Sequence, residues 1–153
     1  MTEQKKTLIH GTAVAIQGSD FPTSAVLLRG FSGRGKSDLA FRLITAGAML
    51  ICDDQVSLER RLDKIVAESV ESIRGLLEVR GVGLLKYPVA KATQLQLIVD
   101  LIPREDVPRL PAKETLDILG IAITSLKLHA FDASTPFKII KAIELVHKPG
   151  LLV

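Results

Sequence analysis

Short apolar runs separated by glycine- and proline-containing stretches predict a fold built mainly on a β-sheet. Residues 11–18, GTAVAIQG, alternate between small and branched side chains, and residues 24–30, SAVLLRG, form a continuous apolar run typical of a buried strand. Residues 37–46 then carry apolar side chains at helical spacing, and Gly47 is placed to cap a helix. The pattern predicts two strands, a glycine-rich turn and a helix.

The rest of the chain repeats strand patterns and ends in a helix. Residues 48–60 predict a buried strand that ends in acids and a second short strand, with residues 64–69 placed to pair with it. Further strand patterns occupy residues 76–88, 93–102 and 117–130, and Ser134 and Pro136 mark the start of the last helix. Residues 103–115, PREDVPRLPAKET, combine three prolines with many charges and predict a mobile loop inside a single domain, residues 1–153.

Composition agrees with one compact domain and excludes several classes of protein. The chain has 153 residues, of which 47% are apolar, and its mean hydropathy is +0.30, enough for a substantial core. Its 20 basic and 17 acidic residues are scattered, and it has one tyrosine and no tryptophan, so we expect no nucleic-acid partner. Cys52 is the single cysteine, which excludes an internal disulfide and favours a reducing compartment. Because residues 1–10 lack a signal-peptide core and no apolar run approaches the about 18 residues of a membrane span, we expect a cytoplasmic protein without a membrane partner.

The glycine-rich turn, GFSGRGKS, has the spacing of a nucleotide phosphate loop. Glycines let backbone N–H groups turn inward toward phosphate oxygens, and the helix that follows adds the positive end of its dipole. Lys36 would reach the β and γ phosphates, and the Ser37 hydroxyl would join the coordination shell of Mg²⁺. The nucleotide-binding residues are predicted to be Gly30, Phe31, Ser32, Gly33, Arg34, Gly35, Lys36 and Ser37. The alternative is a glycine-rich turn with a solvated lysine, which requires neither the hydroxyl nor the flanking strand and helix.

Two places offer the carboxylate that phosphoryl transfer needs to hold Mg²⁺ or to accept a proton. Asp53 and Asp54 follow the apolar run after the helix, and Asp100 ends the run LQLIV. Adjacent strand residues point to opposite faces, so Asp53 and Asp54 cannot both face one γ-phosphate unless the strand has already turned. An acidic turn between strands is the alternative for the pair, and a structural role is favoured for Asp100.

Four segments, in order, resemble the catalytic domain of the HPr kinase/phosphorylase family, which phosphorylates a serine of the phosphocarrier protein HPr. They are IHG at Ile9–Gly11, GFSGRGKS, ICDDQV, and LLEVRGVGLL, which is similar to the family's Leu-Glu-Ile-Arg-Gly-Leu-Gly signature. The resemblance covers most of residues 8–100. It implies an α/β fold with a P-loop-containing mixed β-sheet core and flanking helices, similar to the HPr kinase C-terminal domain and to PEP carboxykinase.

The resemblance also implies roles for individual residues. Lys36 and Ser37 would take ATP and Mg²⁺, and Asp53 and Asp54 would share the proton-transfer role. His10 would be a site residue and Glu78 a second metal contact, while Arg80 is expected to support the signature turn. The implied partner is HPr or an HPr-like phosphocarrier protein, and the family's tendency to oligomerise makes a homo-oligomer a candidate state.

Three departures from the family pattern qualify these expectations. The chain begins close to the catalytic core, which suggests a form without the family's N-terminal domain, and GSDFPTSA makes the link between His10 and the phosphate loop longer. The family's Pro-Gly-Arg-Asn loop, whose arginine is linked to the reverse reaction, is replaced by residues 129–143, which contain no arginine. Lys138 is the nearest cation there, and lysine cannot reproduce a guanidinium fork, so we expect weak or absent phosphorolysis.

Two other functions remain open at this stage. One is a nucleotide-binding regulatory module that has lost efficient transfer and docks partners through residues 103–115. The other is a small-metabolite kinase, which fits less well because strand patterns precede the phosphate loop and residues 103–115 contain only Arg104 and Arg109 as arginines.

Overall fold

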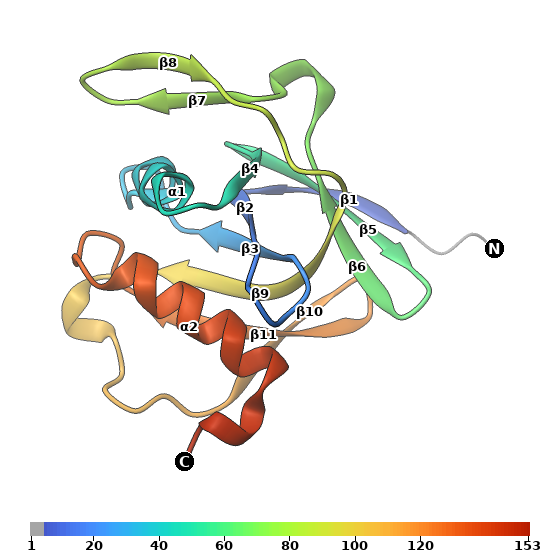
Figure 1. Cartoon of the computed structure of the whole chain (residues 1–153), viewed down its shortest axis with the longest axis vertical. Coiled ribbons are helices and arrows are strands. Elements are labelled where there is room, and N and C mark those ends of the chain that lie inside the picture. Colours follow the sequence, from blue (N-terminus) through green and yellow to red (C-terminus); the bar gives the residue numbers. More distant parts are fainter. Residues whose placement is uncertain (1–4) are drawn as a thin grey trace.

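The computed structural model describes residues 5–153, in which one large curled sheet carries two helices on one side (Figure 1). Residues 1–4, on which part of the expectation about a targeting segment rests, lie outside the described residues. Seven strands of the sheet run in the order β1 (Lys6–His10), β5 (Gln55–Arg61), β6 (Lys64–Glu68), β9 (Thr93–Leu101), β3 (Ser24–Arg29), β2 (Thr12–Ile16) and β4 (Met49–Cys52). β11 (Ile121–Leu128) also pairs with β9, and β10 (Glu114–Ile118) pairs with β11.

Strand β9 is the centre of this sheet. Its first residues pair with β6 in antiparallel fashion, whereas its later residues lie parallel to β3 on one side and to β11 on the other. Eight of its nine residues are apolar, β-branched or glutamine, as befits a strand with neighbours on both edges. The parallel pairing places the end of β9 at the same edge of the sheet as the end of β3, where the glycine-rich turn begins.

Two apolar cores lie on the two faces of β2, β3 and β9. Ala13, Ala15 and Leu27 face one core, which strands β5 and β6 help to close, whereas Val14 and Leu28 face the other, which both helices cover. This double burial explains why the five residues of β2 are all buried and why β3 reads as a continuous apolar run.

Helix α1 (Lys36–Thr45) buries Leu39, Ala40 and Leu43, as the helical spacing predicts, and Gly47 follows its end with φ 115°. Helix α2 (Thr135–His147) has Pro136 in its first turn, and Ser134 holds the N-cap position without a capping side-chain hydrogen bond. Within residues 5–153 neither helix is long and apolar enough to cross a bilayer.

Strands β7 (Leu76–Val79) and β8 (Gly83–Lys86) form a separate hairpin, which Figure 1 shows standing apart from the large sheet beyond α1. Leu77 and Val79 pack with Leu50 and with Phe41 and Ile44 of α1. The side chains of Leu77 and Val79 thus hold the hairpin against α1. Because side chains alternate along a strand, the residue between them points to the opposite, outer face of the hairpin.

Two details of the sequence prediction are wrong. The chain forms an additional strand, β1, which ends at His10 and which the sequence pattern did not predict. The loop predicted at 103–115 ends earlier, because Glu114 and Thr115 already pair with Ser125 and Thr124, and it contains the short 3₁₀ turn η2 (Arg104–Asp106). The first difference arises from pairing with the distant strand β5, and the second from a hairpin in which β10 pairs with β11 across residues 119–120.

Candidate active site

The glycine-rich turn connects the end of β3 to the start of α1, which is the strand-turn-helix order expected of a phosphate loop. Gly35 has φ 86°, and a Cβ atom there would lie 2.8 Å from the ring of Phe131 and 3.0 Å from Cβ of Ala130. Both the backbone conformation and the close neighbour therefore require glycine at this position. The Gly35 carbonyl accepts the first helical bond from Leu39 N–H at 2.9 Å.

Lys36 spans the turn from the helix side. Its Nζ donates to the carbonyl of Gly30 at 2.7 Å and to that of Phe31 at 3.2 Å. The ammonium group is thus held over the loop rather than extended into solvent. Its positive charge lies beside the backbone amides of the loop, where a phosphate would bind. This arrangement disfavours the alternative of a solvated lysine.

The Asp53 carboxylate meets the phosphate loop at Ser37. Ser37 Oγ donates to Oδ1 at 2.9 Å and to Oδ2 at 3.0 Å, and Thr12 Oγ1 donates to Oδ1 at 2.7 Å. Because the Ser37 proton is directed at Asp53, the lone pairs of its oxygen are free for a metal ion. These residues fit Mg²⁺ as a hydroxyl ligand with a carboxylate close behind it. The sequence prediction missed Thr12, although a threonine directly after the His-Gly pair was a visible signal.

Asp54 turns away from Asp53 and toward His10. Its φ of 75° lies in the left-handed region, so the chain has turned and the two neighbouring carboxylates have different partners. Asp54 Oδ1 lies 3.6 Å from His10 Nδ1, and both side chains are open to solvent, 75% and 60% exposed respectively. Gly11 N–H holds the turn by donating to the Asp54 carbonyl at 3.1 Å.

Asp100 is not available as an open carboxylate. It accepts Arg29 Nε at 2.8 Å on one oxygen and Nη2 at 3.2 Å on the other, and the two residues are register partners at the ends of β9 and β3. The bidentate pair fixes the end of the strand that enters the phosphate loop. This agrees with the structural role that the sequence favours for Asp100.

Glu78 lies on the outer face of the β7–β8 hairpin, opposite Leu84, and is exposed to solvent. Among residues 5–153 no three His, Cys, Asp or Glu side chains gather closely enough to share a metal ion, so Glu78 is not grouped with Asp53 and Asp54 in that way. Its role as a metal contact stays a prediction. Arg80 lies in the exposed turn of the hairpin.

Two arginines that the sequence prediction did not assign hold the segment that backs the phosphate loop, residues 129–134. Arg42 of α1 donates to the carbonyls of Ala130 and Asp132, and Arg104 of η2 contacts Asp132 Oδ1 through Nε at 2.7 Å. The Arg104 guanidinium lowers the pKa of Asp132 below its ordinary value. Lys138, the nearest cation of that segment by sequence, lies exposed on α2.

Cys52 precedes the two aspartates and is fully buried, with its Sγ accepting Val70 N–H at 3.4 Å. Burial raises the pKa of this thiol. It therefore stays protonated at neutral pH and does not supply a nucleophile to the site.

Residues 2–148 match the family described as the HPr serine kinase C-terminal domain. The chain belongs to this family. Its curated relatives include the HPr kinase/phosphorylase of Lactobacillus acidophilus, 31% identical over 154 residues that cover 93% of this chain and 44% of the relative. The HPr kinase/phosphorylase of an Acidovorax species is 38% identical over 131 residues, which cover 77% of this chain and 40% of the relative. This family member thus spans less than half the length of either relative.

The fold of this HPr serine kinase C-terminal domain is also found in a solved structure. The structure of the Hpr(Ser) kinase/phosphatase from Coxiella burnetii superimposes with a TM-score of 0.79 at 23% identity, covering 95% of this chain and 92% of that chain. The predicted fold class, an α/β fold with a mixed sheet around a phosphate loop and flanking helices, is confirmed.

Proposed function

We propose that this chain is the catalytic domain of an ATP-dependent serine kinase for HPr or an HPr-like phosphocarrier protein, which would regulate phosphotransferase-system signalling in the cytoplasm. The observation that supports it best is the division of labour between the two neighbouring aspartates. Asp53 bonds to Ser37 of the phosphate loop, whereas Asp54 stays 75% exposed beside His10. One carboxylate serves the nucleotide and the other is open to an incoming protein hydroxyl.

The nucleotide side of the reaction belongs to the phosphate loop. Its backbone N–H groups and Lys36 would bind the β and γ phosphates of ATP and stabilise the charge that develops during transfer. Ser37 and Asp53 would hold Mg²⁺, which supplies charge neutralisation on the phosphate oxygens when it is bound. Thr12 would keep Asp53 aimed at Ser37 through its own hydrogen bond to Oδ1.

The acceptor side belongs to Asp54. The serine oxygen of the phosphocarrier forms the new bond to the γ-phosphorus as the bond to the ADP oxygen breaks, and Asp54 accepts the serine proton. His10, 3.6 Å from this carboxylate, would orient it. The positive φ of Asp54 contributes here, because it directs the carboxylate away from Ser37 and toward the open face.

Mass spectrometry tests the proposal directly. The protein is incubated with ATP, Mg²⁺ and a cognate HPr-like protein, beside Lys36→Ala and Asp54→Asn. We expect one phosphoserine on the partner with the unaltered chain and none with either variant. Folded protein that binds ATP but transfers nothing would favour the regulatory module instead, and transfer to a sugar or nucleoside alone would favour a metabolite kinase.

The reverse reaction has its own test. Residues 129–143 contain no arginine, and the nearby guanidinium of Arg104 is engaged by Asp132, so we expect weak phosphorolysis. Phosphoserine-HPr is incubated with inorganic phosphate and the release of pyrophosphate is followed. Robust dephosphorylation would contradict this expectation.

A further inference from the structure

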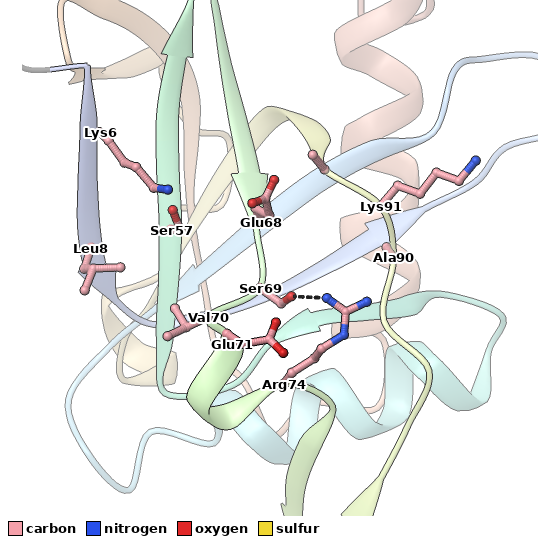
Figure 2. A pocket seen from close by; sticks show the side chains of 11 residues that line it. Lys6, Leu8, Ser57, Glu68, Ser69, Val70, Glu71, Arg74, Ala90 and Lys91 are labelled. Atoms are coloured by element: carbon pink, nitrogen blue, oxygen red, sulfur yellow. Dashed lines mark hydrogen bonds between the residues drawn. The ribbon is translucent and has the colours of Figure 1, made fainter.

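A polar pocket of about 420 Å³ lies on the outer face of strands β1, β5 and β6, outside the site described above (Figure 2). Leu8, Ser57 and Glu68 are register partners across the three strands and form its floor. One wall is the segment from Ser69 to Arg74, which includes the 3₁₀ turn η1 (Glu71–Ile73), and the other is the segment 90–92. This volume lies within the range of about 300 to 1,000 Å³ that small-molecule sites occupy.

The Ser57 hydroxyl at the floor of the pocket is the first sign of a binding site. Ser57 is only 6% exposed, yet its hydroxyl makes no hydrogen bond to any other described residue. Among the described residues no fully buried side-chain oxygen or nitrogen lacks a hydrogen-bond partner, so the Ser57 hydroxyl keeps contact with solvent. The hydroxyl is therefore free to bond to a molecule in the pocket that Ser57 lines.

The charges around the pocket are the second sign. Arg74 and Glu71 come from the same wall, and Lys91 extends at the rim of the other (Figure 2). Within residues 5–153 none of the three forms an ion pair, and the Arg74 guanidinium has only a 3.3 Å hydrogen bond to Ser69 Oγ. Lys6 also lines the pocket, and Glu68 at its floor forms an ion pair with Arg61 at 3.7 Å, but the charges of Arg74 and Glu71 remain available to a molecule that carries both signs.

We propose that this pocket binds a small amphoteric metabolite of the amino-acid class. Its carboxylate would bind Arg74 and Ser69, and its ammonium group would bind Glu71 with Glu68 nearby. The Ser57 hydroxyl would complete the site from below. A purely anionic ligand fits less well, because Glu68 and Glu71 line the same cavity as the cations.

The floor strands connect this pocket to the candidate active site. Leu8 pairs with Ser57, and two residues further along the same strands His10 pairs with Gln55, directly after Asp54. A ligand that tightens the pairing of β1 with β5 would fix the distance between His10 and Asp54. This consequence rests on the proposed function, whereas binding itself does not.

Calorimetry and thermal denaturation with the twenty amino acids, each at millimolar concentration, test the proposal without ATP or a partner protein. Acetate, phosphate and ethylammonium serve as probes that carry one sign of charge. We expect saturable binding of at least one amino acid. Arg74→Gln, Glu71→Gln and Ser57→Ala should each bind it about tenfold more weakly or not at all. Ser125→Ala is the matched control, since Ser125 is also 6% exposed but lies on β11, and it should bind as the unaltered chain does.

Three results would overturn the proposal. They are no saturable binding of any amino acid, binding that is unchanged in Arg74→Gln and Glu71→Gln, and binding of phosphate or acetate that equals the amino acid. Because the assay contains no nucleotide, a failed kinase reaction leaves its outcome intact. A kinase that transfers phosphate but binds no amino acid would refute this site alone.

Discussion

The hydroxyl of Thr12 donates a 2.7 Å hydrogen bond to Oδ1 of Asp53, the oxygen that also accepts the Ser37 hydroxyl. Thr12 begins β2 and Asp53 follows β4, two strands that pair with each other. The bond therefore connects the strand upstream of the phosphate loop to the carboxylate downstream of it. Thr12 is a positioning residue that acts through Asp53.

Replacing Thr12 by valine should weaken the Mg²⁺-dependent part of nucleotide binding. Valine keeps the shape but removes a donor from a partly buried carboxylate, a loss of about 1 to 3 kcal/mol, which corresponds to roughly 5- to 150-fold in affinity. ATP binding is titrated with and without Mg²⁺ using a fluorescent analogue. We expect Thr12→Ser to restore the metal dependence.

Thr93→Val is the matched control for this experiment. Thr93 is also a buried threonine whose hydroxyl donates at 2.7 Å, but its acceptor is the Lys91 carbonyl at the far end of β9. It should lower stability without changing the metal dependence. Equal metal dependence in Thr12→Val and Thr93→Val would refute the positioning role.

Replacing each of the two aspartates by asparagine should impair a different step of the reaction. Asp54→Asn should lower transfer about 100-fold or more while Mg·ATP still binds, because it removes the proton acceptor and leaves the Ser37 contact intact. Asp53→Asn should instead weaken Mg²⁺-dependent binding. Single-turnover kinetics and nucleotide titration distinguish the two losses, and the reverse pattern would exchange the assigned roles.

Gly35→Ala should damage the phosphate loop more than Gly33→Ala. Both glycines have φ near 85°, so each substitution carries a backbone strain of about 1 to 2 kcal/mol. Only at Gly35 does the added methyl group meet the ring of Phe131, at 2.8 Å, whereas at Gly33 nothing lies within 4 Å. Thermal denaturation and ATP titration of both variants check this, and equal losses would show that the Phe131 contact is unimportant.

The Arg104–Asp132 pair predicts a pH-dependent difference in stability. Arg104 lowers the pKa of Asp132 below its ordinary 3.8, so the folded protein binds this proton less readily than the unfolded chain. The pair stabilises the fold above that ordinary value, and this contribution is lost as the pH falls through the lower pKa of the folded state. The melting temperature of Arg104→Gln should therefore fall below that of the unaltered chain at pH 7 and meet it in strong acid. A gap that persists in acid would point to lost packing instead.

The local pattern of the sequence predicted the phosphate loop and its flanking strand and helix. Glycine spacing, the Lys36–Ser37 pair and the apolar positions of α1 are all local, and the fold class they indicate is confirmed. The double burial of β2 was less visible, because its small residues Ala13 and Ala15 face one core while Val14 and Ile16 face the other.

What the sequence did not predict depends on contacts between distant residues. Strand β1 has only two half-buried residues, Thr7 and Ile9, and it exists because it pairs with β5. Likewise, Arg42 and Arg104 reach residues 130–132 across long stretches of chain, and neither position differs in composition from an ordinary surface arginine. The hairpin's separation from the main sheet follows from the packing of Leu77 and Val79 on α1, which alternation alone does not specify.

Three consecutive residues upstream of the phosphate loop each hold one part of the acidic turn. His10 lies beside the Asp54 carboxylate, the Gly11 N–H binds the Asp54 carbonyl, and Thr12 binds the Asp53 carboxylate. Metal binding beside the phosphate loop and the proposed proton transfer therefore both depend on a strand corner that comes earlier in the chain. In the evolution of such a domain, this corner and the acidic turn are expected to change together, while the loop between them can stay the same.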